Sequence, residues 1–195
     1  MNYAQIRRLR EKFYFTAEDV SELLGIKPQS AWVLCSRYAA QGVFVRLKNN
    51  FYVLDERWLN FTREQLFGIA NYLQVPSYIS FMTALSYYEV STQAQNDFFE
   101  SASLRRSVRF EARGTAFNFY KLKKELYFDF SKKGAFFIAG KEKAFLDSMY
   151  LFSFGKYKID TASLDFAKLE KKKIKGMLGR YPAKTKRIVE KVCRI

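Results

Sequence analysis

The sequence predicts an α+β protein with two domains, residues 1–60 and residues 61–195. Three changes of pattern along the chain support this division. Apolar residues recur at helical spacing to about residue 41, and two short β-rich runs follow them. Aromatic residues then alternate at strand spacing between about residues 108 and 139, and helical spacing returns toward the C-terminal end. We therefore expect a helical first domain that ends in a hairpin, then a mixed α/β domain with a small antiparallel sheet and basic C-terminal helices.

The net positive charge of the chain indicates which class of partner it binds. Lysines and arginines outnumber aspartates and glutamates by 34 to 19 in the 195 residues, which gives a net charge of +15. The excess is uneven, since residues 161–195 carry 11 basic and 3 acidic side chains against 9 and 6 in residues 1–60. A sustained positive field favours a polyanionic partner, and nucleic acid is the polyanion we expect. A soluble, positively charged face is the alternative.

The absence of histidine and of common catalytic motifs limits the reactions that the chain could catalyse. The chain has no histidine, which removes Ser-His and Cys-His nucleophilic pairs and nearly all common zinc sites. It also lacks a phosphate-binding loop, a dinucleotide fingerprint and a nucleophile elbow. We therefore expect no catalysis, no cofactor and no metal. Catalysis by carboxylates and a divalent metal stays open through Asp129, Glu142 and Asp147.

Location is predicted from apolar runs and cysteines. No apolar run approaches the roughly 20 residues that span a bilayer, and the charged N-terminal segment is not typical of a signal peptide. Cys35 and Cys193 are far apart in sequence and have no neighbouring cysteine, which fits a reducing compartment. We expect a cytoplasmic protein.

The first 42 residues predict three helices. Residues 1–12 form a short amphipathic helix, and Thr16 provides a hydroxyl cap for a second helix that ends at Gly25. Pro28 suits the first position of a third helix, which we expect to reach about Gln41. A helix, a short turn that contains glycine, and another helix form the helix-turn-helix pattern.

A hairpin follows the third helix. Residues 43–47 and 51–54 are β-rich and flank the turn Lys48-Asn49-Asn50, whose asparagines tolerate positive φ. A hairpin directly behind the second helix of a helix-turn-helix motif is a wing. The four features in this order predict a winged helix-turn-helix in residues 1–60, a domain that binds duplex DNA.

The third helix has two faces at 100° per residue. Ala31, Leu34, Cys35 and Tyr38 share the face that we expect to pack on the first two helices, with Trp32 at its border. The opposite face and the helix start would meet base edges, because glutamine pairs with adenine and arginine pairs with guanine or phosphate. The candidate DNA contacts are Lys27, Gln29, Ser30, Val33 and Arg37 in the helix, with Ser36 beside them, and Arg46, Lys48, Asn49 and Asn50 in the wing. A solvated helix face and a solvated hairpin tip are the alternatives.

Helical and strand patterns alternate in the second domain. Residues 55–60 look like a connector, and the capping box Thr62-x-x-Gln65 opens a helix that ends at Leu73. Pro76 separates it from a helix that reaches about Tyr88 and includes Ile79. We expect antiparallel strands near residues 108–110, 117–119, 127–130 and 135–139, then a helix over residues 141–152. The aromatic residues of this region are expected to form core, with stacking of single-stranded bases as the alternative: Phe98, Phe99, Phe110, Phe117, Phe119, Phe128 and Phe130.

The C-terminal end predicts one or two basic helices after residue 161, with interruptions at Gly179 and Pro182. Their lysines are candidates for phosphate contacts, because such contacts are sequence-blind and need only charge. The residues are Lys168, Lys171, Lys172, Lys173 and Lys175. A partner-binding surface and a solvated face are the alternatives. Lys143 and Asp147 have the i,i+4 spacing of a helical ion pair.

Two segments carry a resemblance to a known family. The segment Pro76-Ser77-Tyr78-Ile79-Ser80 with Ala84-Leu85, and the segment Glu142-Lys143-Ala144 with Leu146-Asp147, follow a predicted winged helix-turn-helix. This order resembles the AbiEi antitoxins of type IV toxin–antitoxin and phage abortive-infection systems, and the resemblance spans nearly the whole chain. The sequence differs from the family pattern at Lys141, where proline is usual, and at Glu89, where glycine is frequent.

The resemblance implies two functions. The N-terminal domain would repress its own operon by binding inverted repeats in operator DNA, through contacts within residues 27–37 and 46–50. The C-terminal domain would neutralise a co-encoded nucleotidyltransferase toxin of the AbiEii type without a stable complex. A stand-alone winged-helix transcription regulator, whose second domain senses a ligand or oligomerises, is the main alternative. A metal-dependent nucleic-acid enzyme is the third.

Overall fold

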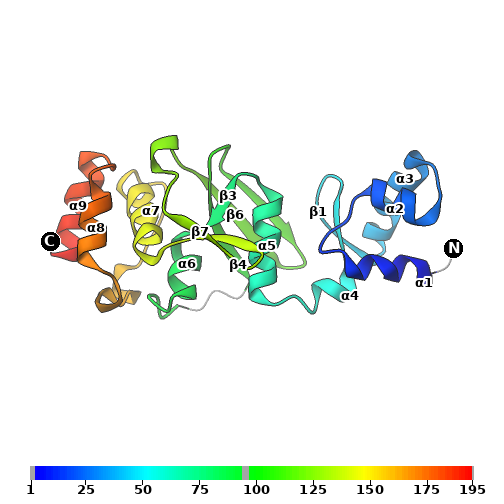
Figure 1. Ribbon diagram of the computed structural model, residues 1–195, viewed down its shortest axis with the longest axis horizontal. Coiled ribbons are helices and arrows are strands. Elements are labelled where there is room, and N and C mark those ends of the chain that lie inside the picture. Colours follow the sequence, from blue (N-terminus) through cyan, green and yellow to red (C-terminus); the bar gives the residue numbers. More distant parts are fainter. Residues whose placement is uncertain (1–2, 94–96, 195) are drawn as a thin grey trace. The chain divides into compact units, whose positions relative to one another are not determined.

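The chain divides into two compact units in the computed structural model, which describes residues 3–93 and 97–194 (Figure 1). The first unit comprises residues 1–62 and 110–114, and the second comprises residues 63–109 and 115–195. Within the described part of the chain, no helix is both long enough and apolar enough to cross a bilayer.

The first unit contains helices and one hairpin. Its elements are α1 (Tyr3–Ile6), η1 (Arg7–Glu11), α2 (Ala17–Leu24), α3 (Pro28–Ala40), β1 (Phe44–Lys48), β2 (Phe51–Leu54) and α4 (Asp55–Trp58). Residues 3–11 of the predicted helix over residues 1–12 therefore form a short α-helix that continues as a 3₁₀ helix, and residues 1–2 lie outside the described residues. The predicted connector over residues 55–60 is wrong, because it holds α4. Asp55 and Glu56 lie in the first turn of α4, where negative charge is favourable.

Aromatic side chains hold the hairpin against the helices of the first unit. The rings of Phe15 and Tyr38 both meet Phe44 edge-on, with centroids 4.8 and 5.3 Å apart. Ile6, Leu34 and other apolar side chains close the core around them. The second unit has its own apolar core, so each unit buries its own hydrophobic residues.

The second unit is a mixed sheet with helices. Its elements are α5 (Arg63–Leu73), β3 (Ser77–Ile79), α6 (Phe81–Tyr87), β4 (Phe98–Ser103), β5 (Val108–Ala112), β6 (Thr115–Lys121), η2 (Lys124–Leu126), β7 (Phe130–Lys133), β8 (Phe136–Ala139), α7 (Lys141–Ser153), η3 (Thr161–Ser163), η4 (Phe166–Lys168), α8 (Lys171–Leu178) and α9 (Ala183–Cys193). The predicted helix over residues 141–152 and the predicted basic C-terminal helices are confirmed.

The sheet of the second unit differs from the predicted one. Its order is β5-β6-β4-β3-β8-β7, and the pairs β4–β6 and β3–β8 are parallel whereas β3–β4 and β7–β8 are antiparallel. The expectation of a small antiparallel sheet in this domain is therefore wrong. Alternation of aromatic residues marks strands without naming their partners. Because β5 takes the edge position, β6 returns beside β4 in the parallel direction.

Two segments adopt another secondary structure than the sequence predicts. Residues 77–79 form β3 instead of the start of a helix, and Tyr78 and Ile79 are fully buried there. Tyr127 and Phe128 precede β7 instead of belonging to a strand. At residues 77–79 the pairing with β4 and β8 decides the conformation, and that pairing is not encoded in local spacing.

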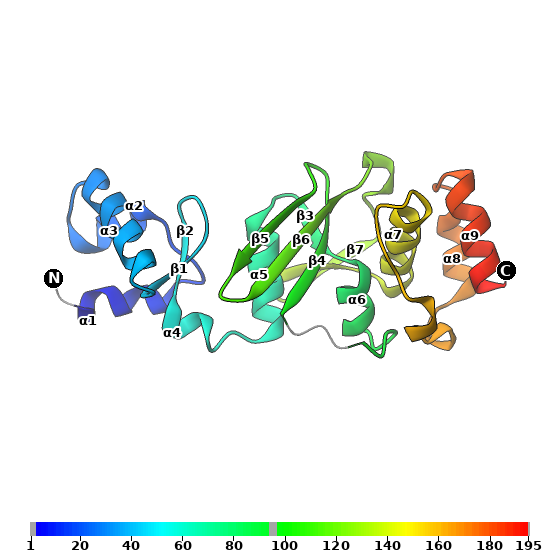
Figure 2. The same ribbon diagram turned by 180° about the vertical axis from the view of Figure 1, so that it is seen from behind.

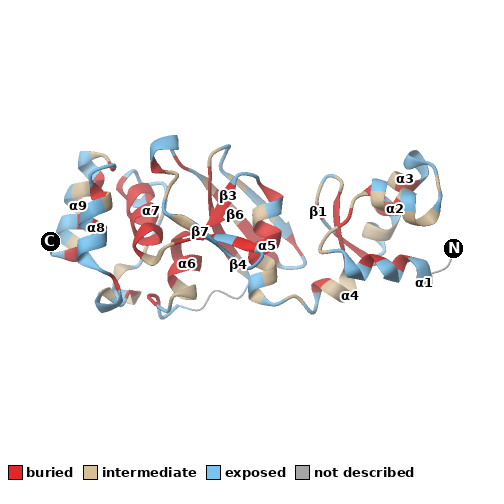
Figure 3. Ribbon diagram, in the orientation of Figure 1, coloured by how far each residue is buried: buried red, intermediate tan, exposed pale blue. Residues whose placement is uncertain are grey.

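Helices cover both faces of the sheet (Figures 1 and 2). Phe67 of α5 packs edge-on against Phe99 of β4 and Phe136 of β8 on one face. On the other face, Tyr78 of β3 meets α7. Helices α8 and α9 pack on α7, and they are largely exposed, whereas α7 is almost entirely buried (Figure 3).

A buried ion pair lies between the sheet and α7. Lys143 and Asp147 are bonded to each other and both side chains are 0% exposed. The Asp147 carboxylate also accepts hydrogen bonds from Tyr78 Oη at 3.0 Å and Ser80 Oγ at 2.8 Å. Burial raises the pKa of Asp147 and lowers that of Lys143, and the charge of each opposes the shift of the other. The predicted i,i+4 pair is confirmed, and its burial is the new finding.

Candidate nucleic-acid interface

Local signals in the sequence set the geometry of the α2–α3 turn. The Thr16 hydroxyl accepts from Asp19 N–H, and the Asp19 carboxylate accepts from Thr16 N–H at 2.7 Å, which completes a capping box. At the other end, Gly25 adopts the left-handed conformation with φ of 62°. Ser21 Oγ donates to the carbonyl of Ile26 at 2.6 Å and closes the turn. α3 then begins at Pro28, as predicted.

The Asp19 carboxylate has a perturbed pKa. Burial alone would raise its pKa, but hydrogen bonds from the Lys12 ammonium and the Thr16 N–H outweigh burial and hold the pKa below the ordinary value. The carboxylate is therefore charged at neutral pH, which is the state that caps the positive start of α2.

α3 presents two faces, as its spacing predicts. Ala31, Leu34 and Cys35 are buried against the other helices. Burial raises the pKa of the Cys35 thiol to about 11, so this side chain packs as a neutral group. The exposed residues of α3 and its N-cap include the predicted contacts Lys27, Gln29, Ser30, Val33 and Arg37, with Ser36 beside them. Val33 is 69% exposed, which is unusual for an aliphatic side chain.

The hairpin β1–β2 is extended by a third segment. Phe15 and Tyr52 exchange two backbone hydrogen bonds of 2.9 Å, which adds residue 15 to the edge of β2. On β1, Arg46 is exposed and donates to Asn49 Oδ1 at 3.2 Å. The Lys48 ammonium lies 5.1 Å from the ring centre of Phe51. Arg46, Lys48 and Asn49 therefore lie in the tip region of the hairpin, where the sequence predicts them.

Asn50, a predicted DNA contact, makes hydrogen bonds within the first unit. Its Oδ1 accepts from Ala17 N–H at 2.7 Å, and its Nδ2 donates to Glu18 Oε2 at 2.6 Å. Asn50 also has a positive φ of 52°. Both ends of the amide are thus occupied in joining the hairpin to the start of α2. Asn50 therefore has a structural role, and a DNA contact by Asn50 stays a prediction.

Carboxylates are absent from the stretch that forms this surface. Residues 23–54 contain four basic residues and no aspartate or glutamate, so the acidic residues of the first unit lie before or after α3 and the hairpin. The net charge of +3 over residues 1–60 conceals this separation. The signal is visible in the sequence, but only a segment-by-segment count reveals it.

The C-terminal lysines are held in different ways. Lys168 bonds to the Glu89 carbonyl at 2.9 Å, and Lys173 pairs with Glu170 at 2.6 Å. Lys171, Lys172 and Lys175 are exposed on α8. All five belong to the second unit, whereas α3 and the β1–β2 hairpin belong to the first.

Comparison with known proteins identifies a shared fold. No known protein family and no curated protein matches the sequence. The structure is similar to the crystal structure of the Rv2827c protein from Mycobacterium tuberculosis, with a TM-score of 0.60 and 11% sequence identity. The match covers 97% of this chain and 74% of that chain. At 11% identity, this similarity shows only a shared α+β fold.

Proposed function

We propose that the protein binds duplex DNA through its first unit, which acts as a winged helix-turn-helix. α3 would be the recognition helix and the β1–β2 hairpin the wing. The observation that supports this most is the carboxylate-free stretch over residues 23–54, which folds into an exposed helix face followed directly by a hairpin with a basic tip. An ordinary solvated surface usually mixes both signs of charge.

The exposed residues of α3 suit different parts of a major groove. Gln29 and Arg37 would pair with base edges, and Lys27 would meet phosphate. Val33 is the apolar member of the face, and an aliphatic side chain in this position suits contact with a thymine methyl group. In the wing, Arg46 and Lys48 would reach the phosphate backbone.

Salt dependence tests this proposal with matched variants. Each lysine or arginine that neutralises a phosphate adds about 0.9 to the slope of log affinity against log salt. The double variant K27Q/R46Q should therefore flatten the slope by about 1.8 in anisotropy titrations of a fluorescent duplex. The control R8Q/R10Q removes the same charge from exposed positions of η1. Equal flattening in both variants would show that only net charge matters and would refute a specific interface.

We further propose that the second unit is an antitoxin domain, so that the whole protein is an autorepressing antitoxin in the cytoplasm. The resemblance to AbiEi supports this, and one structural observation limits which residues could meet a toxin. Tyr78 and Ser80 of the first resembling segment bond to Asp147 of the second. The two segments thus form one buried unit, and buried residues maintain a fold. A partner would instead meet exposed groups such as the lysines of α8.

Co-expression with the adjacent gene, which the proposal expects to encode a nucleotidyltransferase, tests this division of labour. The full-length variant Q29A/R37A should still restore growth while it fails to repress its promoter. The variant K171Q/K172Q/K175Q should show the reverse pattern. If Q29A/R37A loses rescue although it is folded and abundant, the proposed division is wrong. If neither variant nor wild type restores growth, the antitoxin proposal is wrong and a stand-alone regulator remains.

A further inference from the structure

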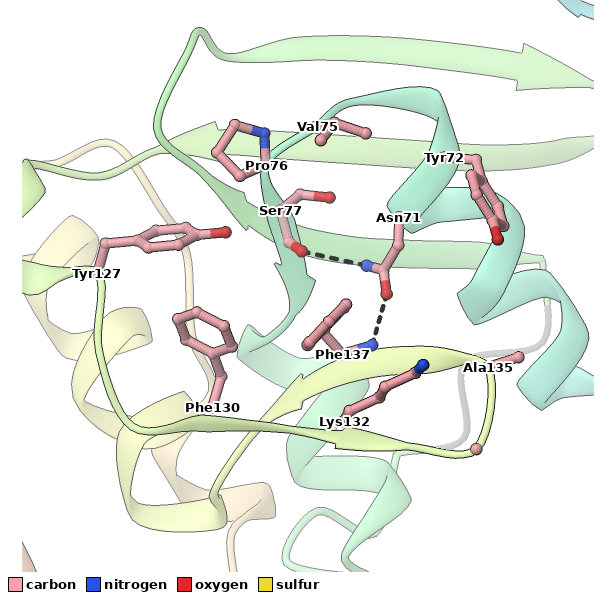
Figure 4. A pocket seen from close by; sticks show the side chains of 11 residues that line it. Asn71, Tyr72, Val75, Pro76, Ser77, Tyr127, Phe130, Lys132, Ala135 and Phe137 are labelled. Carbon is pink, nitrogen blue, oxygen red and sulfur yellow. Dashed lines mark hydrogen bonds between the residues drawn. The ribbon is translucent and has the colours of Figure 1, made fainter.

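The second unit contains a cavity of about 660 Å³ that the proposed DNA binding does not use (Figure 4). Its walls come from the end of α5, the segment that leads into β3, and the β7–β8 hairpin. Tyr72, Val75 and Phe137 line it and are 44, 57 and 41% exposed. Large apolar side chains that are exposed around one hollow mark a binding site more often than those scattered singly.

The cavity is formed before any ligand arrives. β3 and β8 are paired at Ile79 and Ile138. Beyond that pair, the Asn71 amide bridges the two strands: its Nδ2 donates to the Ser77 carbonyl at 3.5 Å, and its Oδ1 accepts from Phe137 N–H at 2.6 Å (Figure 4). A side chain thus stands where a strand-to-strand hydrogen bond would otherwise be, and it keeps the strands apart.

The back wall is supported by stacked aromatic rings. The Phe130 ring stacks on Tyr78 with centroids 4.6 Å apart and an angle of 11°, and Tyr127 meets both rings at 4.9 Å. Tyr78 is itself fixed by its hydrogen bond to the buried Asp147. The wall is therefore preorganised, which lowers the entropic cost of binding a flat ring.

The polar groups of the lining indicate the charge of the ligand. Among the described residues, the Ser77 hydroxyl is buried without a hydrogen-bond partner. A buried hydroxyl without a hydrogen-bond partner destabilises the fold, and a ligand that bonds to it would remove this penalty. The charged residue among the lining residues is Lys132, and none of them is a carboxylate. A ligand with a negative group is therefore favoured over a cationic one.

We propose that this cavity binds a small planar aromatic acid, with its rings against Tyr127 and Phe130 and its anionic group toward Lys132. The volume lies within the range of about 300–1,000 Å³ that holds small organic ligands. This inference does not rest on the proposed DNA binding or antitoxin activity. It gives the second unit a ligand-binding role of its own.

Two dyes test the proposal on the full-length protein. 1-Anilinonaphthalene-8-sulfonate is a planar aromatic anion, and N-phenyl-1-naphthylamine has the same rings without the charge. The anion should bind at one saturable site with increased fluorescence. A135W, which places a large ring in the cavity at an exposed position, should weaken both dyes at least tenfold. K132Q should weaken only the anion, by about fivefold, the upper range for an exposed charge pair.

K133Q is the matched control. Lys133 follows Lys132 on β7, and its ammonium lies over the rings of Tyr87 and Tyr88 at 5.1 and 4.7 Å, away from the cavity. This variant should bind both dyes as the wild type does, and thermal melting should confirm that every variant is folded. Dye binding that survives A135W would place the dyes elsewhere and overturn the proposal. Equal effects of K132Q and K133Q on the anion would overturn the role assigned to charge.

Discussion

Replacement of Lys143 with methionine should destabilise the second unit strongly. Methionine has a similar length, so the change removes the charge with little loss of volume. It leaves the Asp147 carboxylate, which is 0% exposed, without its cation. Three hydroxyl donors remain, Tyr78 Oη at 3.0 Å, Ser80 Oγ at 2.8 Å and, more weakly, Tyr181 Oη at 3.5 Å. These hydrogen bonds partly stabilise the charge of the buried Asp147 carboxylate.

The expected magnitude follows from this arrangement. Removal of one partner from a buried ion pair costs about 3–5 kcal/mol. Because three hydroxyl donors remain, we expect the lower end, about 3 kcal/mol. The double variant K143M/D147L removes both charges together. It should be less destabilised than K143M, since no unpaired charge remains buried, although the hydroxyls of Tyr78 and Ser80 then lack their acceptor.

Urea unfolding followed by two signals measures this effect. Both tryptophans, Trp32 and Trp58, lie in the first unit, so their fluorescence reports on that unit, whereas circular dichroism reports on both. K143M should move the dichroism transition and leave the fluorescence transition in place. The control K173M breaks the exposed Lys173–Glu170 pair and should change neither transition. A loss below about 1 kcal/mol in K143M, or additive effects in the double variant, would refute the reasoning.

The remaining predictions concern the first unit and the tail. Asn50→Ala should lower the stability of the first unit by about 1–2 kcal/mol in tryptophan-monitored unfolding, because Ala17 N–H loses its acceptor. An unchanged stability would show that this hydrogen bond does not stabilise the unit. The stability of this unit should also fall as pH drops through and below about 3.9, because the pKa of Asp19 is lower in the folded than in the unfolded state and protonation removes the cap. Asp19→Asn should abolish that part of the pH dependence, and a persistent dependence would contradict it. The α8 variant K171Q/K172Q/K175Q should leave the salt slope of DNA binding unchanged, because the proposal assigns these lysines to the toxin, and a flatter slope with an intact sequence preference would assign them to phosphate contacts instead.

Local chemistry made the helices of the first unit predictable. The Thr16 cap, Gly25 and Pro28 each act on their own backbone or on a residue nearby, so the ends of α2 and α3 follow from short stretches of sequence. The buried face of α3 also followed from spacing. The residues predicted for its outer face are exposed, because a helix surface is determined by its own period.

Long-range pairing made the remainder unpredictable. β3 has three residues and obtains its conformation from β4 and β8, which come later in the chain. Asn50 looks like a free turn residue until the fold brings Ala17 within hydrogen-bond distance. The spacing of Lys143 and Asp147 predicted their pairing, but not their burial between the sheet and α7. The cavity beside Asn71 depends on residues that are far apart in the chain, since the amide of Asn71 accepts from Phe137 N–H, 66 residues later.

Selection of duplexes from a randomised pool tests the central claim, that α3 reads DNA sequence, most directly. The wild-type protein should enrich a common motif, and Q29A/R37A should retain general affinity but lose that motif, since a good bidentate base contact is worth about 1–3 kcal/mol of discrimination. A double variant that enriches the same motif as the wild type would show that other residues read the bases. A folded wild-type protein that enriches no motif would contradict sequence-specific recognition by α3.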